Sequence, residues 1–99
     1  MQVHELKNHL QSKDRYTGVL TEFAKTKVIQ LQLAAGSEIR EHRTSADALI
    51  VVQKGRVVFA FGDQEVELGP DRLLHIPPDE PHSLRALEEL EALLIRIER

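Results

Sequence analysis

Three of the five histidines, His42, His75 and His82, are the residues best suited to chemistry at a site. An imidazole can hold a transition metal, accept a hydrogen bond from a bound molecule, or exchange a proton near neutral pH. The chain has no cysteine, which excludes disulfides and thiolate metal sites and suits a reducing cytosol. A catalytic metal usually needs three protein ligands. If only two of these histidines share a pocket, we expect them to hydrogen-bond a ligand or water instead of holding a metal.

No other arrangement of catalytic residues stands out in the sequence. There is no Ser-His-Asp order, no nucleophile elbow and no phosphate-binding glycine loop, since the glycines fall at expected turns. Arg40 and Arg43 flank His42 and could steer an anion to the mouth of a pocket. We favour the simpler interpretation, in which these arginines solvate the edge of a strand.

The composition indicates one globular domain with no concentrated basic patch and no long apolar segment. The chain has 99 residues, of which 41% are apolar and 29% charged, and its net charge is -3. Nucleic acids and anionic membranes attract proteins through concentrated basic patches, and none is present. No apolar run approaches the roughly 20 residues of a membrane span, and the first residues lack the apolar core of a signal peptide. We therefore expect a cytoplasmic protein with neither nucleic acid nor membrane as partner.

Short apolar segments, separated by turn signals at intervals of about ten residues, predict an all-β sandwich or barrel. In residues 28–33 apolar side chains alternate with glutamines, which predicts a strand with one buried face. The uninterrupted run ALIVV at 48–52 predicts a strand covered on both faces. Further strands are expected at 57–61, 65–68 and 72–76.

The two ends of the chain are harder to interpret. Apolar residues at helical spacing predict a short helix over 2–11, within an N-terminal arm of residues 1–19 that precedes a barrel domain of residues 20–99. At the C-terminus the composition favours a helix from Leu87 onward. The alternation from Leu93 to Ile97 instead favours a closing strand from about Glu91. We choose the strand, because a barrel must complete its second sheet.

The stretch from Gly36 to Gly55 resembles the first of two sequence motifs of the cupin superfamily. In that motif a glycine precedes a His-x-His pair, a glutamate and a closing turn glycine. His42 takes the place of the first histidine. Thr44 stands where the second histidine belongs and Ala48 where the glutamate belongs, so this motif keeps one of its three usual metal ligands.

The stretch 71–82 resembles the second motif, in which Pro-x-Gly is followed by a histidine. Pro77 and His82 match this pattern, and Asp79 occupies the place of the glycine. The resemblance covers roughly residues 20–98, and both motifs occur in the expected order. The chain is thus identified as a small single-domain, RmlC-like cupin with degenerate metal-binding motifs. The resemblance implies an all-β double-stranded β-helix, a jelly-roll barrel, with a central pocket.

Metal-binding cupins hold their cation with four side chains, and the resemblance leaves His42 and His82 for that role. His75 could complete a site for zinc, nickel, iron or manganese if it points into the same cavity. Glu41 and Asp47 neighbour motif positions, but strand alternation turns them to the other face unless a bulge intervenes. The predicted ligand-binding pocket consists of His42, Thr44, Ala48, His75 and His82.

Two main functions are compatible with this pattern. The favoured one is binding of a small polar metabolite in the barrel pocket without a requirement for metal. The alternative is a metal-dependent cupin enzyme, an oxygenase or isomerase, that uses His42, His82 and His75. A weaker third possibility is a cupin that acts mainly as an oligomeric partner of another protein. Because cupins commonly pair through a sheet, we also expect a homodimer.

Overall fold

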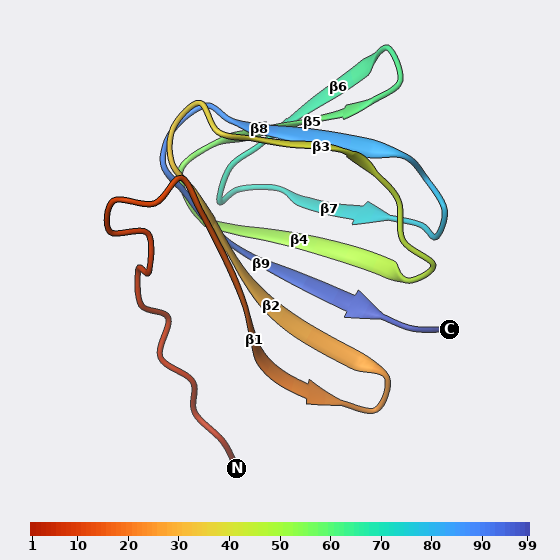
Figure 1. Cartoon of the computed structure of the whole chain (residues 1–99). Coiled ribbons are helices and arrows are strands. Elements are labelled where there is room, and N and C mark those ends of the chain that lie inside the picture. Colours follow the sequence, from red (N-terminus) through yellow and green to blue (C-terminus); the bar gives the residue numbers. More distant parts are fainter.

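The computed structural model describes all 99 residues and consists of strands, turns and one extended arm (Figure 1). The strands are β1 (Arg15–Phe23), β2 (Thr26–Leu33), β3 (Glu38–His42), β4 (Asp47–Lys54), β5 (Val57–Phe61), β6 (Gln64–Leu68), β7 (Leu73–Ile76), β8 (His82–Ala86) and β9 (Leu90–Ile97). The predicted all-β class is therefore confirmed. The chain forms no helix that is long and apolar enough to cross a membrane.

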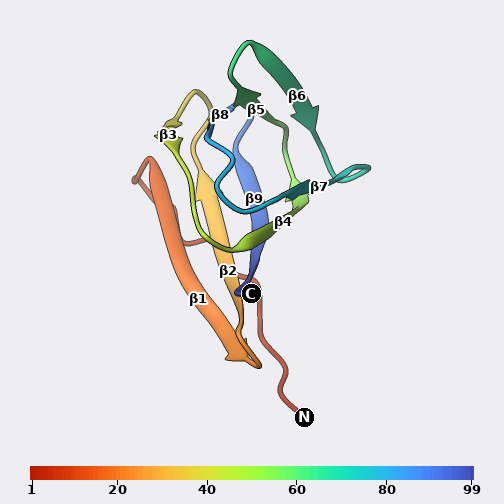
Figure 2. The same ribbon diagram turned by 90° about the vertical axis from the view of Figure 1, so that its right-hand side faces the viewer.

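Two antiparallel sheets pack face to face. One has the strand order β1-β2-β9-β4-β7 and the other the order β3-β8-β5-β6. The non-consecutive neighbours arise because the chain crosses repeatedly from one sheet to the other, which is the topology of a double-stranded β-helix. In Figure 1 the sheets converge on the left and diverge toward the right, and Figure 2 shows them from the diverging end.

The core fills the space between the two sheets. Phe59 is its largest fully buried side chain, and Phe61 packs against the core from the same face of β5, as the alternation in this strand predicts. The buried apolar residues of this core are Leu31, Leu33, Ala48, Ile50, Val52, Val57, Phe59, Leu68, Ile76, Leu84, Ala86, Leu90 and Ala92.

The N-terminal segment is not the predicted helix. It runs as an extended arm past the outer face of β2, where Gln30 and Gln32 are buried although the alternation predicted an exposed polar face. The carbonyl oxygen of Lys7 accepts hydrogen bonds from the side-chain amides of Gln30, at 3.1 Å, and Gln32, at 2.8 Å. The backbone N–H of His9 donates to Oε1 of Gln32 at 2.7 Å. A short isolated helix is marginal in water, and here the glutamines satisfy the backbone groups that a helix would have paired internally.

The C-terminal segment forms the strand that we chose. β9 is a central strand that pairs with β2 and with β4 along its length, and these two ladders override the local helix propensity. At the other end, β1 begins at Arg15, so the boundary expected between residues 19 and 20 falls inside a strand. The arm is correspondingly shorter than predicted.

The strand over residues 48–52 is covered on one face only. Ala48, Ile50 and Val52 are buried between the sheets, whereas Leu49 and Val51 are partly exposed on the outer face. The expectation that both faces are covered is therefore not met within one copy of the chain. Leu49 and Val51 therefore leave apolar surface partly exposed on the outer face of this strand.

Candidate ligand pocket

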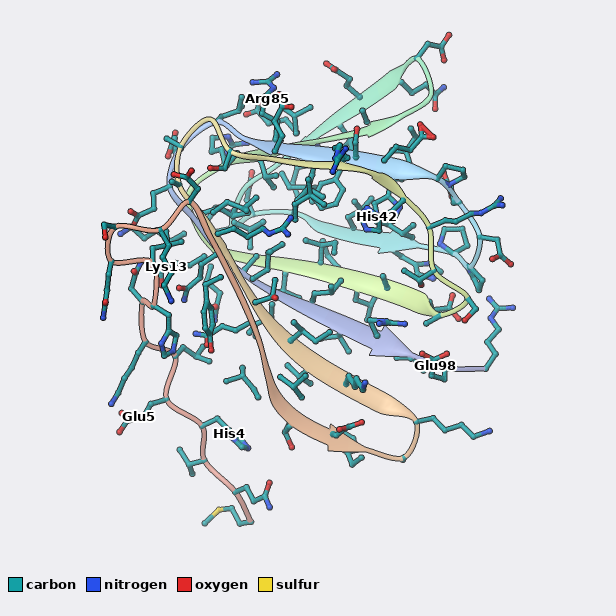
Figure 3. All side chains as sticks on the ribbon, in the orientation of Figure 1. His4, Glu5, Lys13, His42, Arg85 and Glu98 are labelled. Atoms are coloured by element: carbon teal, nitrogen blue, oxygen red, sulfur yellow. The ribbon has the colours of Figure 1, made fainter.

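A cavity of about 280 Å³ lies between the two sheets, with residues of both sheets in its wall. Its apolar lining comes from Leu31, Ile39, Ile50, Phe59, Leu84 and Leu94, and its polar lining from Arg15, Thr17, His42 and His82. Figure 3 places His42 in the space between the sheets, toward their diverging end. The pocket therefore combines an apolar interior with a few polar groups, as small-molecule sites commonly do.

A β-bulge turns His42 into this cavity. In the ladder between β3 and β8, Ile39 lies opposite Leu84 and His42 lies opposite His82, with an irregularity between these pairs. β3 thus advances by one residue more than β8 over this interval, and strict alternation is broken. As a result Ile39 and His42 both line the cavity, while Glu41 between them is exposed, as expected.

The two motif histidines lie side by side with the same ring nitrogen free. Their ring centroids are 4.4 Å apart, and the rings are tilted by 60°. Nδ1 of His42 lies 2.9 Å from the carbonyl oxygen of Arg40, and Nδ1 of His82 lies 2.9 Å from that of Glu80. Because a carbonyl oxygen only accepts, each Nδ1 carries the hydrogen, and each Nε2 of a neutral ring is left as an acceptor.

Burial determines the charge of His82. It lies against the rings of Phe59 and Phe61, whose centroids are 6.2 and 5.9 Å from its own, and it is 5% exposed. Burial lowers the pKa of His82, the hydrogen bond to the Glu80 carbonyl partly opposes this, and the neighbouring His42 lowers the pKa further. His82 is therefore neutral at neutral pH, and its Nε2 is an acceptor for a hydrogen bond or a metal.

His75 is not part of this pocket, and its assignment to the pocket and to a metal site is wrong. In β7 the side chains of Leu74 and Ile76 pack with the core, so His75 points to the outer face. Its Nε2 lies 2.8 Å from Oδ1 of Asp47, and Nε of Arg99 lies 2.8 Å from Oδ2 of the same carboxylate. Hydrogen bonds from Arg99, and then from His75, lower the pKa of Asp47 to about 2.

Thr44 and Ala48 both lie on the cavity side of the molecule, but neither offers a free donor atom. Thr44 lines a second hollow of about 410 Å³ at the mouth of the barrel, together with His42. Its hydroxyl donates to the carbonyl oxygen of Ala46 at 3.2 Å and accepts from the N–H of Ala46 at 3.1 Å. Ala48 faces the core, is 5% exposed and lines neither hollow.

The backbone supports the motif alignment at the positions reserved for glycine. Asp79, in the place of a glycine, has a φ of 64°, which glycine adopts freely and aspartate tolerates better than most residues. Its N–H donates to the Thr44 carbonyl at 2.7 Å and so joins the two motifs. Gly55 has a φ of 88°, and a Cβ there would lie 2.1 Å from the carbonyl oxygen of Glu89, so only glycine fits.

A metal does not fit the side chains at this site. No three histidine, cysteine, aspartate or glutamate side chains are grouped so that they could hold one. His42 and His82 supply two nitrogen donors, the Thr44 hydroxyl is engaged with backbone, and Ala48 has no donor. This falls short of the three protein ligands of a typical catalytic centre.

Sequence reasoning overlooked the contribution of the first and last strands. Thr17 from β1 and Leu94 from β9 line both the inner cavity and the mouth, and Arg96 lines the mouth. The signal was present for β9, because Leu94 and Arg96 are two residues apart and so share a face. This spacing predicts that Leu94 and Arg96 line the pocket only if it is known which face of β9 points inward.

Comparisons with known proteins agree with this fold. The model of the cupin domain family matches residues 30–97, so the chain belongs to the cupin family. Among solved structures, an RmlC-like cupin protein from Desulfovibrio desulfuricans has a TM-score of 0.85 and 22% identity, and the match covers 98% of this chain and 96% of that one. The predicted RmlC-like cupin fold is thereby confirmed.

Two further structures show the same architecture in other settings. A cupin superfamily protein from Desulfitobacterium hafniense has a TM-score of 0.79 and 21% identity, with 86% of this chain and 78% of that chain covered. The cupin domain of an XRE family transcriptional regulator from Enterobacter cloacae has a TM-score of 0.73 and 19% identity, with 88% and 99% covered. A search of curated proteins found no match.

Proposed function

We propose that this cupin binds a small organic molecule in the barrel cavity, and that His42 and His82 bind it directly without a metal. The observation that carries the proposal is the arrangement of the two rings. Each Nδ1–H is tied to a backbone carbonyl, so both Nε2 atoms are left as acceptors on side chains that line one cavity. A bound molecule with a hydroxyl or amine would donate to them.

The lining of the cavity defines the rest of the ligand. Leu31, Ile50 and Phe59 belong to the apolar lining of the cavity, in which Phe59 lies beside His82. A volume of about 280 Å³ is suited to a small metabolite rather than a large cofactor. We therefore expect a compact molecule with an apolar body and at least one hydrogen-bond donor.

Binding without catalysis agrees with the use of the same fold in a regulatory protein. The similar cupin domain from Enterobacter cloacae is part of a transcriptional regulator. A sensor or carrier needs a selective pocket, and it needs no third metal ligand. The alternative of a metal-dependent oxygenase or isomerase would require donor atoms that the pocket side chains do not supply.

The test uses phenol and anisole as a matched pair of probes. They share an aromatic body, but only phenol carries an O–H that can donate to Nε2. We expect phenol to shift the ring ¹⁵N resonances of His42 and His82 in a saturable way and to bind more tightly than anisole. The His42→Gln and His82→Gln variants should each lose this preference, whereas His4→Gln, in the exposed arm, should keep it.

Native mass spectrometry of protein purified under mild conditions provides a second readout, because a resident small molecule adds a defined mass. Equal binding of phenol and anisole, with unmoved histidine resonances, would contradict the direct role of the imidazoles. Unchanged binding in both histidine variants would contradict the location of the site.

A further inference from the structure

Arg96 brings a positive charge to the inner face of the barrel at its mouth. In β9 it lies opposite Ala48 of β4, and its neighbour on the same face, Leu94, lines the inner cavity. Arg96 itself lines the mouth together with Thr44 and His42. The guanidinium is therefore placed where a molecule enters the cavity that holds the two histidines.

The guanidinium is incompletely paired. Its Nε is buried and has no hydrogen-bond partner, although the side chain as a whole is 31% exposed. Its Nη2 lies 3.3 Å from Oε1 of Glu98, two residues further along the same chain, and that carboxylate is about half exposed. Across the ladder Ala48 has no acceptor, and the Thr44 hydroxyl is already engaged with Ala46.

Such an arrangement is unfavourable unless something else completes it. A buried donor of a charged group that lacks an acceptor loses its hydration without replacement. Lys27, opposite Arg96 in the ladder with β2, pairs at 3.9 Å with Glu22, and both line a hollow together with Arg96 and Glu98. The exposed ion pair with Glu98 is weak, because solvent competes for both partners. An acceptor delivered by a ligand would bind at the accessible Nη groups of Arg96, beside Glu98 or in its place.

We propose that Arg96 binds the carboxylate of the ligand at the mouth of the barrel, while the body of the ligand extends inward and brings its hydrogen-bond donor to His42 and His82. The planar guanidinium presents parallel N–H groups that match the two oxygens of a carboxylate. This assignment rests on the proposed ligand-binding function and narrows it to small monocarboxylates. Because Ala48 provides no acceptor opposite Arg96, the carboxylate with which the ligand must compete is that of Glu98.

The experiment compares butyrate and hexanoate with their primary amides, butyramide and hexanamide, which have the same shape and no charge. Binding is followed by the Nε–H resonance of Arg96 and by the ring resonances of His42 and His82. We expect each carboxylate to shift the Arg96 resonance in a saturable way and to bind about tenfold more tightly than its amide. Hexanoate should also shift His82, because its chain reaches deeper.

Four variants make the test specific to this residue. Arg96→Gln should remove the preference for the acid over the amide, and Arg96→Lys should keep only part of it, because an ammonium lacks the planar fork. Arg85→Gln is the matched control, because Arg85 is exposed on β8 and lines neither hollow of the site. Glu98→Gln removes the competing carboxylate and should tighten butyrate binding about two- to threefold. This last variant keeps the proposal testable even if Arg96→Gln does not fold.

The outcomes separate the two proposals. If acids and amides bind equally and both shift His42 and His82, Arg96 is not an anion anchor, although the pocket still binds ligands. If phenol binds at the histidines but no carboxylate moves the Arg96 resonance, the anchor is likewise overturned. If Glu98→Gln leaves butyrate binding unchanged or weaker, Nη2 of Arg96 does not receive the carboxylate.

Discussion

The burial of the His82 imidazole should make the stability of the whole chain depend on pH. Its pKa in the folded protein lies below the ordinary 6.5. Above pH 6.5 the ring is neutral in both folded and unfolded chains, so it adds no pH dependence. As the pH falls through 6.5 the unfolded chain takes up a proton that the folded chain resists, and the free energy of unfolding decreases.

We therefore expect the parent to lose stability between pH 7 and pH 5 more steeply than His82→Gln, which has no ionisable group at this position. Urea unfolding at half-unit pH steps measures the difference, and His4→Gln serves as the exposed control. Parallel curves for the parent and His82→Gln would show that the ring is protonated as easily in the folded state as in the unfolded one.

Thr44 and Ala48 test whether the cupin motifs are aligned correctly. Replacement of both, as Thr44→His with Ala48→Glu, should place three imidazoles and a carboxylate at the mouth and bind Mn²⁺ or Zn²⁺. Without metal the double variant should be less stable by about 1–3 kcal/mol, because a larger polar side chain replaces the buried Ala48. Added metal should restore stability through linkage.

Calorimetric titration and thermal melts with and without metal measure both effects. Ala48→Glu alone is a useful comparison, because its carboxylate would lie opposite Arg96 in the ladder and should compete with butyrate. A folded double variant that takes up no more metal than the parent would mean that one of the two side chains faces away from His42 and His82.

At the scale of single elements, the hairpin between β1 and β2 contains a local conflict between sequence and conformation. Ala24 and Lys25 form its two-residue turn, and both have positive φ, 44° and 64°. Such turns favour Asn-Gly, because residues other than Gly, Asn and Asp are strained at positive φ. Ala24→Asn with Lys25→Gly should raise the free energy of unfolding by about 1–2 kcal/mol.

Chemical denaturation measures this gain. Gly62→Ala is the control in the opposite direction. Gly62 has a φ of 62°, and the Cβ of an alanine there would have no atom within 4 Å, so the loss of stability measures the cost of positive φ alone. We expect a loss of about 1 kcal/mol there. A neutral result for the Asn-Gly variant would show that the hairpin tip does not hold this conformation in solution.

Much of the architecture could be predicted from the sequence, because strand alternation and turn residues are local signals. The alternation from Val57 to Phe61 placed Phe59 in the core, and the motif spacing singled out His42 and His82, which line the same cavity. His75 could not be placed, because both faces of β7 carry an apolar residue and local pattern does not say which face turns inward. The bulge that turns His42 inward is likewise invisible without the register of β8.

Tertiary partners explain the remaining differences. β9 is a strand because it lies between β2 and β4, although its composition suits a helix. The N-terminal helix fails to form because Gln30 and Gln32 pair with the backbone of the arm. The alternation from Leu93 to Ile97 already favoured the strand, whereas nothing within residues 2–11 indicates that Gln30 and Gln32 pair with the arm.

At the scale of the whole molecule, the outer face of the five-stranded sheet carries an apolar patch next to the polar cluster of His75, Asp47 and Arg99. Leu49 and Val51 are partly exposed there, and Leu73, opposite Val51 in the ladder, is 64% exposed. We propose that a second copy of the chain covers this face in a two-fold homodimer. Self-association of one apolar sheet face is an isologous contact and closes at two copies.

Light scattering at micromolar concentration should give twice 11.3 kDa for the parent. Leu73→Glu should give a monomer, because it places a charge in the middle of the proposed contact. Leu87→Glu, which changes an exposed leucine outside this sheet, should leave the dimer intact. A parent that stays monomeric in dilute, low-salt buffer contradicts the proposed dimer.

The central claim is that His42 and His82 bind an organic ligand directly, with no metal between them. The most direct measurement determines the metal content of protein purified without a histidine tag, and the affinity for phenol and butyrate before and after treatment with a chelator. We predict far less than one metal per chain and the same affinities in both samples. One tightly bound metal per chain, with binding lost on chelation and restored when that metal is returned, would contradict the claim.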